Sequence, residues 1–153
     1  MEELLKNQKS LIISSLGRDK SPQISYAPFI MIEDKIYVYL SRVAEHYYNL
    51  RDNKECSVML IEDESKCRTI FARTRLSFQC EAKLFNGKNE KIFEEFDRVH
   101  DSKMMAMFKN MDFELFELNI KIGRLVKGFG QAFDVKLENG KFTCLQVTEI
   151  ARR

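Results

Sequence analysis

The chain has 153 residues and a mass of 18.0 kDa, the size of one ordinary domain that buries about two-thirds of its unfolded surface. Hydrophobic residues make up 44% and charged residues 31%, which is typical of a soluble globular protein and argues against disorder. A formal net charge of +2 predicts no strong binding to nucleic acid or to a membrane surface. We therefore expect a single domain over residues 1–153.

The distribution of apolar residues predicts a cytoplasmic protein. The longest apolar runs, Ala27–Ile32 and Ile36–Leu40, are too short to span a bilayer. The charged start of the chain lacks the apolar core of a signal peptide. Without a secretion signal, the four cysteines are expected to be reduced thiols. No two of them have the short spacing of a metal-binding or redox motif, and the two histidines, His46 and His100, are far apart in the chain, so we expect no metal site.

The first half of the chain has the pattern of a helix followed by a meander of short strands. Aromatic and β-branched residues alternate with polar ones, and the strands are separated by charged turns of about three to five residues. The expected elements are a helix at Glu2–Gln8, strands at Ser10–Leu16, Pro22–Ile32 and Ile36–Leu40, a helix at Val43–Asp52 and a strand at Glu55–Ile61.

The second half predicts longer strands around one helical stretch. A charged loop at Glu62–Thr69 precedes a strand at Ile70–Leu84, a helical stretch at Asn86–Asn110, an alternating strand at Phe113–Ile122, and two further strands within Arg124–Val147 with turns at Gly128–Gly130 and Asn139-Gly140. A phase slip between Leu115 and Phe116 indicates a bulge. Helices that interrupt the strands, rather than alternate with them, argue against a parallel sheet and favour a mainly β, antiparallel barrel with peripheral helices.

Ser41 and Arg42 form a candidate anion site at the end of the third expected strand. Ser41 supplies a hydroxyl and Arg42 a planar set of donors, beside the N–H groups of the helix that follows. The alternative is a serine helix cap with a solvated arginine. No nucleophile, base and acid stand together in the sequence, so catalytic residues stay unassigned and a cofactor would have to supply any chemistry.

Several short motifs, in this order along nearly the whole chain, carry a resemblance to a known family. They are Ser25-Tyr26-Ala27-Pro28, Tyr37 through Leu40-Ser41-Arg42, Ala44-Glu45-His46, Asn49-Leu50, Ile61-Glu62-Asp63-Glu64, Phe71 through Arg75-Leu76, and Gly128-Phe129-Gly130. Together they resemble the FMN-binding split barrel of the pyridoxamine 5'-phosphate oxidase-like proteins, especially their HugZ/HutZ haem-utilisation branch. The resemblance implies an antiparallel split β-barrel of the FMN-binding type.

The resemblance also implies where a cofactor would lie. The strand with Ser25, Tyr26 and Ala27 would run beneath the flavin, Ser41 and Arg42 would hold its phosphate, and Arg75 would approach from a partner subunit. The implied cofactor contacts are Ser25, Tyr26, Ala27, Tyr37, Ser41, Arg42, His46 and Arg75. Two departures stand out: Val43 replaces the lysine of the oxidase pattern, and nothing matches the C-terminal segment that completes a pyridoxal-type substrate site. We therefore do not expect vitamin B6 oxidation.

The haem-degrading members of the branch use a histidine near the chain's end as iron ligand, and this chain has none after His100. His46 matches the branch's histidine on the helix after Ser-Arg. The alternative is a helix-face imidazole hydrogen-bonded to the next subunit or to the neighbourhood of Glu45. We predict a homodimer that binds FMN and acts as an oxidoreductase on an unidentified small molecule. The alternatives are haem binding or breakdown in the same cleft, and a barrel that has lost its cofactor. Apolar positions in Ile70–Leu84 and Phe113–Val126, more numerous than a small barrel interior needs, predict the dimer.

Overall fold

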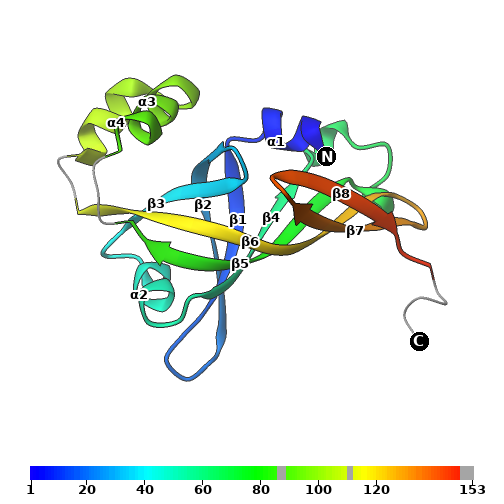
Figure 1. Cartoon of the computed structure of the whole chain (residues 1–153), viewed down its shortest axis with the longest axis horizontal. Coiled ribbons are helices and arrows are strands. Elements are labelled where there is room, and N and C mark those ends of the chain that lie inside the picture. Colours follow the sequence, from blue (N-terminus) through cyan, green and yellow to red (C-terminus); the bar gives the residue numbers. More distant parts are fainter. Residues whose placement is uncertain (86–88, 110–111, 149–153) are drawn as a thin grey trace.

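An eight-stranded antiparallel sheet forms the body of the protein in the computed structural model, which describes residues 1–85, 89–109 and 112–148 (Figure 1). The strands are β1 (Ser10–Leu16), β2 (Pro22–Ile32), β3 (Lys35–Ser41), β4 (Glu55–Ile61), β5 (Arg75–Leu84), β6 (Phe113–Gly128), β7 (Gln131–Glu138) and β8 (Lys141–Gln146). The helices are α1 (Glu2–Asn7), α2 (Glu45–Asp52), α3 (Glu90–Val99) and α4 (Ser102–Lys109), with short 3₁₀ turns η1 (Glu64–Lys66) and η2 (Ile70–Ala72).

The first six strands close into a barrel. Neighbouring strands follow the order β3-β2-β1-β4-β5-β6-β7-β8, and β3 also pairs with β6, from Lys35 opposite Asn119 to Ser41 opposite Phe113. This second pairing removes both edges of the six-stranded unit, and the β7–β8 hairpin extends beyond it. The mainly β, antiparallel barrel with peripheral helices predicted from the sequence is confirmed.

The apolar side chains divide into two clusters on the two sides of β3 and β6. Alternate residues such as Val38, Phe78 and Phe116 fill the barrel interior and are almost inaccessible to solvent. A second cluster, which includes Leu115 and Phe96, lies between the outer face of β3 and β6 and the helices α3 and α4, which lie together at one end of the barrel in Figure 1. Much of the apolar surplus that predicted a dimer is thus buried within one chain, whereas Ile70 and Phe71 at its start are exposed.

The predicted bulge between Leu115 and Phe116 is wrong. The β3–β6 register runs unbroken through both residues, and both are buried because they face different clusters. Burial on both faces hides the alternation that a one-sided strand would show. The register shift lies further along, where Gln79 pairs with Ile122 and Cys80 with Ile120, so that Lys121 is the extra residue.

Other element boundaries also differ from the sequence prediction. The strand expected at Ile70–Leu84 begins at Arg75, and its first residues form η2 instead. The helical stretch Asn86–Asn110 is two helices interrupted at His100 and Asp101, although its ends, 86–88 and 110, lie outside the described residues. The predicted turn at Asn139-Gly140 is confirmed, with φ of 51° and 76°. Within the described part of the chain, no helix is long and apolar enough to cross a membrane.

Candidate functional site

Helix α2 is fixed against the barrel by its buried face and by one amide side chain. Tyr47 and Leu50 are buried in the interface with the strands. The Asn49 amide Nδ2 donates to Ser15 Oγ at 3.1 Å, on β1, and to Gln23 Oε1 at 2.6 Å, on β2. These contacts place α2 beside the start of β2. The helix begins at Glu45, and not at Val43 as predicted.

This docking creates a small cleft beside His46, here called the His46 cleft. Its volume is about 260 Å³, and its lining residues are Gln23, Ile24, Ser25, Ala44, Glu45 and His46. Burial lowers the pKa of the His46 imidazole below its ordinary value, so the ring is neutral at pH 7. A neutral imidazole carries the lone pair that a metal ion binds.

Exposed apolar side chains stand around the His46 cleft. Ile24 and Tyr26 project from the outer face of β2 with 76% and 68% of their surface accessible, and Val43, next to Ala44, is 91% exposed. Apolar residues gathered around a concave site, rather than scattered singly, are typical of a ligand or partner surface. The arrangement therefore offers exposed apolar surface next to a neutral imidazole.

The charge of Arg42 is balanced by a carboxylate of the same chain. Its guanidinium forms an ion pair with the Glu114 carboxylate on β6. The other carboxylate oxygen of Glu114 accepts a hydrogen bond from the Tyr47 hydroxyl at 2.9 Å. The Arg42 guanidinium holds the pKa of Glu114 below its ordinary value, and the Tyr47 bond acts in the same direction. Arg42 and Glu114, here called the Arg42–Glu114 pair, thus lie at the end of the barrel beside α2. The Tyr47 hydroxyl is bonded to the carboxylate of this pair.

The structure brings only some of the predicted cofactor residues together. Ser25 and His46 share the His46 cleft, and Tyr26 is exposed on the same strand as Ser25. Ser41 lies one turn before α2, where its carbonyl accepts the Ala44 N–H at 3.0 Å. Arg75, the first residue of β5, does not line the His46 cleft and donates to the Arg73 carbonyl at 3.1 Å.

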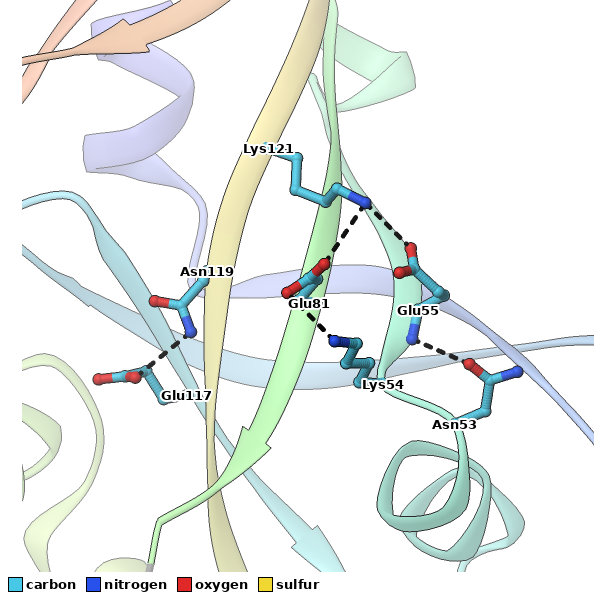
Figure 2. Close-up of polar contacts among 7 residues, drawn as sticks. All are labelled: Asn53, Lys54, Glu55, Glu81, Glu117, Asn119 and Lys121. Carbon is cyan, nitrogen blue, oxygen red and sulfur yellow. Dashed lines mark hydrogen bonds and ion pairs between the residues drawn. The ribbon is translucent and has the colours of Figure 1, made fainter.

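Two predicted contacts have side chains inside the protein. Ala27 faces the barrel interior and is 2% exposed, so only its backbone is left to touch a cofactor. Tyr37 lies in the cluster under α3, where its hydroxyl donates to Glu117 Oε1 at 3.0 Å. Burial, with the Glu117 bond second, raises the pKa of Tyr37 to about 12. Figure 2 shows that Glu117 also accepts from Asn119, so this carboxylate belongs to a structural network.

His100 also has a structural contact. Its Nε2 lies 2.9 Å from the Phe29 carbonyl oxygen, and its ring stacks on Phe96 with 5.7 Å between centroids. The contact ties the end of α3 to β2. His46 is therefore the imidazole that faces a cleft.

Sequence reasoning missed Glu114 and Tyr47. Glu114 appears only as one polar position in an alternating strand, and Tyr47 as one of two aromatics on a helix. Glu114 reaches Arg42 and Tyr47 only through the pairing of β3 with β6, since Arg42 and Glu114 are 72 positions apart in the chain.

The sequence of the chain matches a known protein family over most of its length. Residues 1–127 match the family pattern described as pyridoxamine 5'-phosphate oxidase, which is more than half of the chain. The chain belongs to this family. The split-barrel fold of the family accounts for the closure of β3 on β6 and for the peripheral helices.

The chain is similar to two named bacterial proteins, HutZ and ChuZ. The chain is 33% identical over 142 residues to the heme oxygenase HutZ of Vibrio cholerae, covering 88% of this chain and 78% of the relative. It superposes on the crystal structure of Campylobacter jejuni ChuZ with a TM-score of 0.83 and 32% identity, over 94% of this chain and 60% of ChuZ. The crystal structure of HutZ, described as the heme storage protein from Vibrio cholerae, matches with a TM-score of 0.72 and 29% identity, over 78% of this chain and 87% of HutZ.

Proposed function

We propose that the protein binds haem, with the His46 imidazole as the iron ligand. The observation that carries the proposal is a neutral, half-buried imidazole that opens onto an apolar surface. The names of the relatives, heme oxygenase and heme storage protein, support the same cofactor. FMN has weaker support, because Arg42, the residue expected to hold its phosphate, is already paired with Glu114.

The residues around His46 suit a porphyrin. Ile24, Tyr26 and Val43 offer apolar contact to its flat face, and their burial on binding would keep water from the iron. Bound haem would supply a redox-active iron, and the chain's own part would be to hold the ring and to ligate the iron through His46. Haem would then be the small molecule on which the protein acts.

A haem titration tests the proposal. Adding hemin to the purified chain is expected to produce a sharp, red-shifted Soret band that saturates at about one haem per protomer, as one imidazole ligand per chain requires. FMN added in a parallel titration is expected to bind at least about tenfold more weakly. A chain that binds FMN more tightly than hemin would overturn the proposal and restore the flavin-dependent oxidoreductase predicted from the sequence.

We also propose that the site is completed by a second copy of the chain. Haem carries two carboxylates, and the cation nearest the His46 cleft in sequence, Arg42, is neutralised by Glu114. A second surface has the cations that the cleft lacks. Its depression of about 440 Å³ is lined by the cations Lys66, Arg68 and Lys127, with one carboxylate, Glu62, and by the exposed ring of Phe129. The exposed apolar residues Ile70 and Phe71 lie in the chain between two further lining residues, Thr69 and Ala72.

This second surface cannot serve the His46 cleft of its own chain. Phe129 is in the turn between β6 and β7, and in Figure 1 this turn and α2 lie at opposite ends of the molecule. A two-fold dimer would bring the aromatic and cationic surface of one protomer to the cleft of the other. Arg75, expected from the sequence to act from a partner subunit, lies on the strand that follows η2.

Sedimentation equilibrium tests the dimer. The parent chain is expected to have twice its 18.0 kDa mass at micromolar concentration. The double variant Phe71→Asp/Phe129→Asp should sediment as a monomer, because two buried carboxylates would destabilise the interface. The control is Leu145→Asp on β8, which is 71% exposed and lies outside this surface. A monomeric parent, or a double variant that stays dimeric, would contradict the proposed arrangement.

A further inference from the structure

The Arg42–Glu114 pair stands where the sequence predicts an anion site, but the anion is part of the chain. Glu114 lies on β6 opposite Leu40, and its carboxylate binds the guanidinium of Arg42, the residue that follows β3. Its carboxylate is only 23% exposed, whereas the Arg42 side chain is 52% exposed. The cation is therefore accessible, but its charge is already balanced.

The carboxylate is held firmly in this position. Tyr47, which donates to Glu114 at 2.9 Å, is 5% exposed, and its ring packs edge-on against Phe116 with 5.5 Å between centroids. Because the Tyr47 ring is buried and fixed by packing, its hydroxyl holds the Glu114 carboxylate in one position. Because the pKa of Glu114 is lowered by Arg42 and Tyr47, the carboxylate is ionised at neutral pH.

The backbone of the same turn offers no spare donors at three successive residues. The Arg42 N–H donates to the Asp112 carbonyl at 2.8 Å, the Val43 N–H to Ser41 Oγ at 3.3 Å, and the Ala44 N–H to the Ser41 carbonyl at 3.0 Å. A phosphate cradle depends on N–H groups that are free to point at the ligand. In addition, Val43 supplies no positive charge at the position after Arg42.

We propose that Glu114 is a specificity-determining residue that closes this anion site to phosphate-bearing ligands. A phosphate monoester approaching Arg42 would meet the fixed carboxylate at close range, and two like charges near one cation repel each other. The chain would therefore discriminate against FMN through a repulsive group, and not only through the lack of an attractive one. This inference goes beyond haem binding and does not depend on it.

Replacing the carboxylate by its neutral isostere tests the inference. Glu114→Gln keeps an oxygen that can accept the Tyr47 hydrogen bond and frees the Arg42 charge. In titrations followed by flavin fluorescence, the variant is expected to bind FMN at least about tenfold more tightly than the parent does. Riboflavin, which has the same ring and no phosphate, should bind parent and variant within about twofold of each other.

Two matched variants separate this explanation from a general charge effect. Glu55→Gln also removes one negative charge from an ion-paired carboxylate on the barrel, since Glu55 binds Lys121 at 3.4 Å (Figure 2). It should leave FMN affinity unchanged. Arg42→Ala in the Glu114→Gln background should abolish the gain, because the freed guanidinium is the group that binds the phosphate.

A single variant at the exposed arginine provides an independent test if Glu114→Gln does not fold. Because the charge of Arg42 is balanced in the parent, Arg42→Ala alone should change FMN affinity by less than about twofold. An unchanged FMN affinity in folded Glu114→Gln would overturn the inference. A tenfold loss of FMN, but not of riboflavin, in Arg42→Ala would also overturn it. Neither outcome depends on whether hemin gives a Soret band, so failure here is distinct from failure of the haem proposal.

Discussion

Gly123→Ala is expected to destabilise the protein by about 2 kcal/mol, although the change adds a single methyl group. A Cβ at position 123 would lie 2.7 and 2.8 Å from two ring carbons of Phe78 and 3.0 Å from the Ser77 carbonyl oxygen. Phe78 cannot move aside easily, because it is 1% exposed and stacks on Phe142 at 5.8 Å between centroids. Relief of the clash therefore requires the β5–β6 ladder to shift.

Gly128→Ala is the matched control, since it makes the same chemical change at the end of the same strand. A Cβ at position 128 would meet only the Gln131 side-chain oxygen, at 3.7 Å, which is ordinary van der Waals contact. We expect this variant to stay within about 0.5 kcal/mol of the parent in urea denaturation followed by circular dichroism. Equal midpoints for the parent and Gly123→Ala would show that the barrel adapts at this crossing.

The barrel was predictable because its strands keep a two-residue period over most of their length. Residues such as Leu76 and Phe78 alternate with polar neighbours, so one buried face can be recognised without knowing its partner strand. The period fails at Leu115 and Phe116, where helices α3 and α4 bury the outer face as well. The sequence pattern within one strand cannot show that helices from another part of the chain cover its second face.

Contacts with distant parts of the chain also determined which site residues could be predicted from the sequence. Ser25 and His46 share a cleft because α2 docks on β2 shortly after the chain leaves β3. The partner of Arg42 lies on β6, and no feature near Arg42 in the sequence points to Glu114. Tyr37 has the residue type of a ring contact, yet the outer face of β3 is covered by α3. Exposure and long-range partners follow from the closure of the barrel.

His46→Ala is expected to have the largest effect on haem. The chain has two histidines, and His100 is bonded to the Phe29 carbonyl, so a spectrum that depends on imidazole has to come from His46. Loss of the ligand should shift and broaden the Soret band and speed haem dissociation by at least about tenfold. Adding free imidazole should restore the sharp band, which a purely structural role of His46 would not allow.

The control for this prediction is the second histidine. His100→Gln should leave the Soret band unchanged and lower the melting temperature, because the ring packs on Phe96 and bonds to β2. The pH dependence gives a further check. Burial lowers the pKa of His46, so protons compete with iron only at a lower pH than for an exposed histidine, and the band should persist at pH values where free imidazole is already protonated. An identical Soret band in parent and His46→Ala would instead make His46 a helix-face imidazole and assign the iron to a ligand other than this side chain.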